Sequence, residues 1–317
     1  MRRDFLGNLG VLAVLALAGP ARAGPLMDML RERRAAKQGA SGDTEDGTST
    51  DATTGKRSFT PPAGITVERD LAYGSDPAQR LDVYRGAEIK NAPVIIMVHG
   101  GGWRRGDKGG PSMVKNKVLH WVGKGWVLVS VNYRLVPAAN PAEQAEDIGR
   151  ALAFAQGKAR SWGADPSRFI LMGHSSGSHV VALVSADGSL ATRHGAQPWL
   201  ATVAIDSAAL DIEAIMNRKH YGLYDTAFGS DPKLWREASP MARLTGRPAA
   251  PMLMVCSSKR DDSCPPAREF AAKANGLGGR VTVLPIELNH AEINDQLGTS
   301  GAYTDAVDAF LRTVGLP

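Results

Sequence analysis

A serine flanked by glycines is the first feature that points to chemistry: residues 173–177 read Gly-His-Ser-Ser-Gly. This G-x-S-x-G pattern is typical of a nucleophile held at a sharp turn between a strand and a helix. The apolar run over residues 169–172 suits the strand, and the residues after Ser176 suit the helix. We therefore expect Ser175 to be an exposed nucleophile with the helix N-terminus behind it.

A second glycine cluster follows an apolar run: residues 99–103 read His-Gly-Gly-Gly-Trp. Glycines let the backbone approach a substrate carbonyl without a Cβ atom and leave N–H groups free to donate. We assign Gly101 and Gly102, together with the N–H of Ser176, to an oxyanion hole. His99 is assigned a structural hydrogen bond within its loop. A phosphate-binding loop is the rival interpretation, but neither G-x-G-x-x-G nor G-K-[ST] follows the strand.

Chain order identifies the partners of the nucleophile, because they follow it as acid and then histidine. Of the seven histidines, only His290 lies beyond the last expected strand, in a loop that can reach Ser175. The acid should follow the strand expected at residues 252–255, where Asp261 and Asp262 are adjacent candidates. We prefer Asp262, and the choice between the two stays open. Its carboxylate would accept from the imidazole and fix the tautomer.

Two cysteines, Cys256 and Cys264, lie in the same segment as the candidate acids. In an oxidising compartment they can pair, and the disulfide would then staple the acid loop. Two unpaired thiols are the alternative. No cysteine and histidine cluster has zinc spacing. The chemistry expected of the serine needs no metal and no organic cofactor.

The elements that position these residues follow from an alternation of apolar runs with helical patterns from about Pro62 onward. This alternation predicts an α/β fold, a mostly parallel sheet with helices on both faces. Strands are expected at residues 65–73, 80–84, 94–98, 127–131, 169–172, 202–205, 252–255 and 281–285, and helices at 141–160, 177–184, 267–274 and 304–314.

The segment from residue 211 to 247 breaks this alternation. It carries methionine, tryptophan and tyrosine residues without a strand, so we expect a small cap between the strands near 205 and 252. Trp103 has two interpretations that remain open. It either binds substrate as part of the pocket lining or packs in the core beside its loop.

The N-terminal region has the features of an export signal. Two arginines, an apolar stretch over residues 9–18 and an Ala-Arg-Ala pattern at 21–23 predict a signal peptide over residues 1–23. Residues 2–6, Arg-Arg-Asp-Phe-Leu, resemble the twin-arginine signal, with an ordinary secretory signal as the alternative. Residues 24–60 are predicted to be a flexible linker, because their polar composition cannot offset the entropy of ordering. The catalytic domain is then residues 61–317, and we expect a periplasmic or secreted bacterial protein.

Composition limits the classes of partner. The formal net charge is +5, and basic and acidic residues alternate, without the basic stripe expected of a nucleic-acid-binding protein. The apolar stretch near the N-terminus is too short for a membrane span, so none is expected after signal removal. The expected partner is a small-molecule ester, and the oligomeric state stays open.

From about residue 65 to 316 the chain resembles the α/β-hydrolase esterase/lipase family. Within it, the sequence is similar to the branch with an H-G-G-x-W oxyanion loop, which includes carboxylesterases, feruloyl-esterase-like enzymes and arylformamidases. The residues that carry the resemblance are 99–103, 131–135, 173–177 and the aspartate and histidine of the C-terminal part. The resemblance implies that Arg134 pairs with Asp147. Cys264 departs from the hydrophobic residue that many relatives have there, which leaves the identity of the acid open.

The activity implied by this resemblance is hydrolysis of carboxylic esters by a Ser-His-Asp triad through an acyl-enzyme. An amidase such as an arylformamidase is the first alternative, because it uses the same triad. A catalytically inactive binding protein with a hydrolase fold is an alternative of another class. Inactive relatives typically lack the nucleophile, the base or the oxyanion glycines, whereas this chain has residues suited to all three roles.

Overall fold

The computed structural model describes residues 58–317, so the predicted signal peptide and nearly all of the predicted linker lie outside the described residues. One eight-stranded sheet has the strand order β1-β2-β4-β3-β5-β6-β7-β8. The pairs β1–β2 and β2–β4 are antiparallel, and all the others are parallel. The mostly parallel sheet expected from the sequence is confirmed.

The strands are β1 (Ile65–Ala72), β2 (Arg80–Gly86), β3 (Ala92–Val98), β4 (Val127–Val131), β5 (Ala164–His174), β6 (Ala201–Ile205), β7 (Met252–Ser257) and β8 (Val281–Ile286). The longer helices are α2 (Pro111–Trp121), α3 (Pro141–Lys158), α4 (Ser176–Ala186), α10 (Cys264–Gly276) and α12 (Ala302–Arg312). The shorter helices are α5 (Ser189–Thr192), α6 (Ile212–Met216), α7 (Gly222–Phe228), α8 (Pro232–Glu237), α9 (Pro240–Arg243) and α11 (His290–Asp295).

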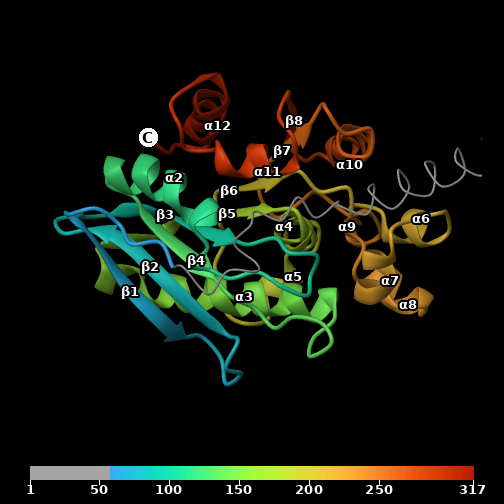
Figure 1. Ribbon diagram of the computed structural model, residues 1–317, viewed down its shortest axis with the longest axis horizontal. Helices are drawn as coiled ribbons and strands as arrows, with labels where there is room; N and C mark the ends of the chain where they lie inside the picture. The colour runs from blue at the N-terminus through green and yellow to red at the C-terminus, as the bar shows by residue number, and fades with distance from the viewer. Residues whose placement is uncertain (1–57) are drawn as a thin grey trace, which may run out of the picture. The chain divides into compact units, whose positions relative to one another are not determined.

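Helices cover both faces of the sheet, with α3 and α4 on one face and α2 and α12 on the other (Figure 1). The middle of the sheet is therefore apolar on both sides, and every residue of β3 is buried. Continuous apolar strands are what a parallel sheet covered on two faces requires. Helix α3 begins at a capping box. The Asn140 side chain accepts from the N–H of Glu143, and the Glu143 carboxylate accepts from the N–H of Asn140.

Helix α2 has no counterpart among the helices expected from the sequence. Its buried face carries Met113, Val114, Val118 and Trp121, but the fully buried Lys117 lies on the same face. A lysine among the apolar residues interrupts the helical repeat of apolar positions, and this repeat is what identifies a helix in a sequence.

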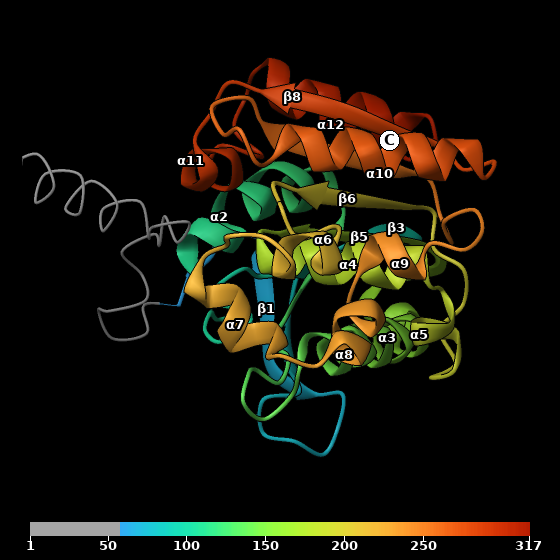
Figure 2. The same cartoon turned by 90° about the vertical axis from the view of Figure 1, so that its right-hand side faces the viewer.

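The expected cap consists of the four short helices α6 to α9, and the described residues 211–247 contain no strand. These helices gather on the side of the domain that faces the viewer in Figure 2. No helix of the described residues combines the length and apolar character needed to cross a membrane.

The structure confirms the predicted pairing of Arg134 with Asp147 and moves the start of the domain. Arg134 forms the two-pronged ion pair with Asp147 that the resemblance implied, at 2.8 and 2.9 Å, and this pair ties the segment after β4 to α3. The predicted linker ends too late. The ring centroids of Phe59 and Tyr84 lie 6.2 Å apart, and the Phe59 N–H donates to the Gly109 carbonyl. The domain therefore includes Phe59.

Candidate active site

Ser175 lies at the turn between β5 and α4 with a φ angle of 56°. A non-glycine residue in this region is strained by about 1–3 kcal/mol, and such strain is concentrated at functional sites. Glycines on either side make the turn feasible. A Cβ atom on Gly177 would lie 2.3 Å from the carbonyl oxygen of Val98, and one on Gly173 would lie 2.3 Å from that of Gly177. The strand, the turn and the helix can approach this closely only without those side chains.

The structure brings Ser175 and His290 together, as the sequence predicts. Ser175 Oγ lies 2.9 Å from His290 Nε2. The sequence predicts His290 in a loop, but the residue is instead the first of α11. A capping box between Asn289 and Glu292 starts this helix directly at the imidazole. The backbone of the histidine is therefore held by the helix start.

The carboxylate at the other side of the imidazole belongs to Asp206, 2.5 Å from His290 Nδ1 to Oδ2. The expected contact of His290 with Asp262 or Asp261 is wrong. Asp261 is exposed, and the half-exposed Asp262 carboxylate forms an ion pair with Arg260 at 3.1 Å. The side chain of Asp206, in contrast, is completely buried.

Sheet register explains why Asp206 reaches the site. Strand β6 lies beside β5, where Ile205 pairs with His174, and the Ser175 N–H donates to the Ile205 carbonyl at 2.9 Å. Asp206, the residue directly after β6, thus emerges beside Ser175. The sequence contained a signal for it, since an aspartate directly follows the strand expected at residues 202–205 and the order serine, acid, histidine holds for it too.

Three groups besides the imidazole contact the Asp206 carboxylate. The Ser257 N–H donates to Oδ1 at 2.7 Å, the Ser263 hydroxyl also donates to Oδ1, and Arg260 Nη1 lies 3.0 Å from Oδ2. Burial by itself raises the pKa of Asp206. The hydrogen bond and the charge of His290, with smaller contributions from Arg260 and Ser263, outweigh burial and lower the pKa below its usual value.

The tautomer of His290 follows from these neighbours. A carboxylate accepts only, so Nδ1 carries the proton toward Asp206 and leaves Nε2 to accept from the Ser175 hydroxyl. Arg260 Nη1 lies 2.8 Å from the same Nδ1 atom, and its acceptor there is the Asp206 carboxylate. The imidazole is thus oriented as a general base.

The glycine loop after β3 passes directly against the nucleophile. A Cβ atom on Gly100 would lie 2.9 Å from the Ser175 Cβ atom. The N–H groups of Gly101 and Gly102 donate to no backbone carbonyl among the described residues. His99 has the structural role expected of it, because its Nδ1–H donates to the Gly100 carbonyl at 2.7 Å. Burial lowers the pKa of His99, so the ring is neutral.

Trp103 packs in the core, the second of its two interpretations. Only 3% of the residue is exposed, which leaves little surface for a substrate. Its Nε1–H donates to Nδ1 of His179 at 3.0 Å, and its ring meets Phe228 of the cap edge to face at 4.9 Å. Burial lowers the pKa of His179 to about 4, and its other nitrogen donates to Ala238. The indole therefore joins the glycine loop to the cap.

His174, the residue before Ser175, contacts the main chain of His290. Its Nε2–H donates to the backbone carbonyl of His290 at 2.9 Å. Burial, followed by the nearby charge of His290, holds the pKa of His174 well below its usual value. The neutral ring thus fixes the main chain of the base and adds no charge to the site.

The two cysteines form a disulfide, which confirms the pairing and excludes two unpaired thiols. Within residues 58–317, no group of three or more His, Cys, Asp or Glu side chains is arranged to hold a metal ion.

The chain is similar in sequence to a known protein family and to curated esterases. A family model described as BD-FAE matches residues 81–268, more than half of the chain. Esterase LipC of Mycobacterium tuberculosis (strain ATCC 25618 / H37Rv) is 27% identical over 235 residues, which cover 66% of this chain and 55% of LipC. Esterase LipQ of the same organism is 27% identical over 268 residues, with 77% and 62% covered. The chain thus spans less than two thirds of both curated relatives.

Solved structures of other esterases have the same fold. Phosphonate-inhibited esterase B from Lactobacillus rhamnosis superposes with a TM-score of 0.65 at 19% identity, covering 92% of this chain and 96% of that one. The apo form of Thermogutta terrifontis esterase 2 gives 0.64 at 20% identity, covering 81% and 97%. At these identities the likeness establishes the α/β-hydrolase fold.

Proposed function

Because the chain belongs to the BD-FAE family, we propose that it is a serine hydrolase of the carboxylesterase type that cleaves small carboxylic esters. The observation that carries this proposal is the continuous hydrogen-bonded line from the Ser175 hydroxyl through His290 to the buried Asp206 carboxylate. The esterase relatives support the choice of an ester as substrate.

Acylation begins when Ser175 Oγ attacks the ester carbonyl while His290 Nε2 takes the hydroxyl proton. The Asp206 carboxylate stabilises the imidazolium that forms and holds the ring in place. His290 then gives the proton to the departing alcohol oxygen, which leaves an ester on Ser175. In the second step His290 takes a proton from water, the resulting hydroxide attacks the acyl carbonyl, and Ser175 recovers its proton.

The negative oxygen of each tetrahedral intermediate needs donors, and the N–H groups of Gly101, Gly102 and Ser176 are proposed for this role. The first two belong to the loop that passes against the nucleophile and donate to no backbone carbonyl among the described residues. Ser176 begins helix α4, whose N-terminus favours negative charge. Loss of one such donor typically raises the barrier by about 3 kcal/mol.

A substrate panel tests the proposal. Purified protein is assayed with short-chain aryl esters and with N-formyl anilides of matched size, beside the S175A variant. We expect esters to be turned over in preference to anilides, and S175A to be inactive while its melting temperature stays nearly unchanged. Preference for the anilides would indicate an amidase. Failure of the folded protein to cleave either class would indicate a binding protein.

Export of the chain is a second proposal, based on the sequence features of residues 1–23. The disulfide supports it, because such bonds persist in oxidising compartments and are rare in the cytosol. The twin-arginine pattern favours export in the folded state.

A further inference from the structure

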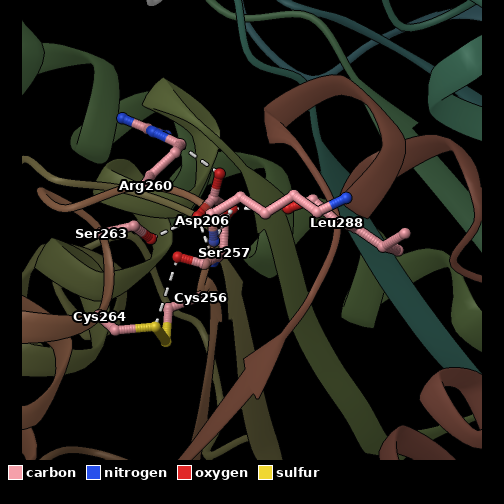
Figure 3. Close-up of a disulfide and its surroundings, with 8 residues drawn as sticks. Asp206, Cys256, Ser257, Arg260, Ser263, Cys264 and Leu288 are labelled. Carbon is pink, nitrogen blue, oxygen red and sulfur yellow. Dashed lines mark hydrogen bonds and ion pairs between the residues drawn. A yellow bond between two sulfur atoms is a disulfide. The ribbon is translucent and has the colours of Figure 1, made fainter.

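Apart from His290, the residues that contact the Asp206 carboxylate all come from one short segment of the chain. This segment runs from Ser257, the last residue of β7, through Arg260 to Ser263 at the N-cap of α10 (Figure 3). The sequence predicts this segment as the source of the acid itself, with Asp261 and Asp262 as candidates. It instead surrounds an acid that comes from the neighbouring strand.

The donors are divided between the two carboxylate oxygens. Oδ1 accepts from the Ser257 N–H and from the Ser263 hydroxyl, whereas Oδ2 faces the imidazole. Two donors at fixed positions on Oδ1 prevent rotation about the Cβ–Cγ bond of Asp206. Oδ2 is therefore held toward His290 Nδ1 before any substrate arrives.

Ser263 departs from the ordinary use of its position. It is the N-cap residue of α10, where a serine side chain normally accepts from the N–H groups of the first helical turn. Here the side chain makes no capping hydrogen bond, and its hydroxyl donates to Asp206 instead. The completely buried hydroxyl therefore serves the carboxylate rather than the helix.

Ser257 ties the acid to the segment that leads to the base. Its N–H donates to Asp206, and its hydroxyl donates to the carbonyl of Leu288 at 2.6 Å. Leu288 lies two residues before His290. Ser257 thus links Asp206 to the segment that carries His290.

The disulfide fixes both ends of this loop. Cys256 directly precedes Ser257, and Cys264 directly follows Ser263 (Figure 3). Closing a loop this short removes much of its conformational freedom. Both cysteines are buried, at 1% and 5% exposure, so the disulfide is shielded from solvent.

We propose that Ser257, Arg260 and Ser263, braced by the Cys256–Cys264 disulfide, form a carboxylate clamp that orients Asp206 for catalysis. These are positioning residues, because they act through Asp206 and touch no reacting atom. The proposal rests on the proposed serine-hydrolase function.

The first test compares S263A with S258A. Ser258 is an exposed serine of the same loop whose N–H donates to the Ile286 carbonyl, so its substitution is the matched control. A hydrogen bond to a charged group is worth enough that its loss should lower kcat by roughly 10- to 100-fold, with KM unchanged. S258A should match the wild type in both constants. The rate of covalent inactivation by a fluorophosphonate should fall in parallel with kcat in S263A.

A double-mutant cycle separates positioning from general support of the fold. If Ser263 acts through Asp206, S263A should lower the inactivation rate of the wild type but have no further effect in the D206N background. Equal fold-losses in both backgrounds would overturn the clamp. So would S263A with kcat equal to that of S258A.

The paired C256A/C264A variant tests the brace in the same cycle. We expect a loss of kcat that vanishes in the D206N background. If this variant does not fold, the cycle with Ser263 decides alone. S175A distinguishes the two levels of failure. Full turnover by S175A would sink the proposed function and the clamp together, whereas inactive S175A beside fully active S263A would sink only the clamp.

Discussion

In the proposed mechanism, activation of Ser175 depends on a buried negative charge that keeps the His290 imidazole oriented and stabilises it once protonated. Asp206 is completely buried and its pKa is lowered, so it stays ionised throughout the neutral range. Asp262 is half-exposed and neutralises part of the charge of Arg260. The two aspartates are thus chemically alike but stand in different environments, and only one contacts the base.

D206N should lower kcat by about 10⁴-fold, because an amide favours the wrong imidazole tautomer and offers no charge. D262N and D261N should retain activity within a few-fold of the wild type. Steady-state hydrolysis of one aryl ester by the three variants decides the matter. A severe loss in D262N beside a mild one in D206N would return the acid to the position expected from the sequence.

The sequence predicted the contact between Ser175 and His290 but not the carboxylate on the other side of the imidazole. A serine between glycines after an apolar strand has few other uses, and only one histidine had the right rank in the chain. Aspartates are common at strand ends, and the required order was satisfied both by Asp206 and by Asp262. Only sheet register and burial distinguish them.

Among the elements, α11 carries the base and is held in place by α2. Lys117 Nζ donates to the backbone and side-chain oxygens of Asn294 at 2.7 and 3.0 Å, and Asn116 donates to the carbonyl of Asp295. Lys117 is completely buried, and burial lowers its pKa to about 7. The contact between the two helices thus contains a group that titrates near neutrality.

This lysine should make the free energy of unfolding depend on pH. Between about pH 7 and 10 the unfolded chain keeps the Lys117 proton, whereas the folded chain has lost it. The unfolded state then binds more protons, so stability rises with pH, by at most about 1.4 kcal/mol per unit. Below pH 7 the lysine is charged in both states, and this contribution levels off.

Urea unfolding at pH 7.5 and 9.5 measures the effect, with K117M as the comparison. We expect the wild type to gain stability over this interval relative to K117M. Parallel pH dependences in the two proteins would show that the lysine keeps its ordinary pKa. The difference between the two slopes is the quantity to compare, since other groups titrate equally in both.

The close approach of α4 to β3 gives a second prediction for the elements. G177A should lower stability by about 1–3 kcal/mol or more, because the new methyl group would meet the Val98 carbonyl at 2.3 Å. G157A is the matched control, since Gly157 lies in α3 with nothing within 4 Å of the added atom. It should raise stability by about 0.5–1 kcal/mol. Thermal melting of both variants tests the pair, and equal shifts would contradict it.

Elements with long apolar runs or clear helical periods were predictable, and the others were not. The central strands are continuous apolar segments, and α3 repeats its buried residues along most of its 18 residues. Helix α11 has only six residues, too few to show a period. Helix α2 was not predicted, because Lys117 interrupts the apolar repeat of its buried face. Both α2 and α11 help to hold His290 in place.

In the molecule as a whole, the site lies where the carboxyl ends of neighbouring strands meet. The glycine loop follows β3, Ser175 follows β5, Asp206 follows β6, the clamp begins at the last residue of β7 and His290 follows β8. Parallel strands bring all these ends to one edge of the sheet, which the alternating pattern of the sequence does predict. Which carboxylate faces the imidazole depends on register, and the sequence does not encode register in any local pattern.

Export is tested on the full chain in a bacterial host. We expect the periplasmic fraction to contain a chain that lacks residues 1–23 and has its disulfide formed. Replacement of Arg2 and Arg3 by lysine should retain the protein in the cytoplasm if the twin-arginine route is used. Unchanged export of this variant would indicate an ordinary secretory signal.

The most direct test of the proposed chemistry is covalent labelling of the folded protein by a fluorophosphonate, followed by peptide mass spectrometry. We expect one adduct, on the peptide that contains Ser175, and a labelling rate that falls sharply in H290A. No adduct on the folded protein, or an adduct on another residue with Ser175 untouched, would contradict a serine nucleophile activated by His290.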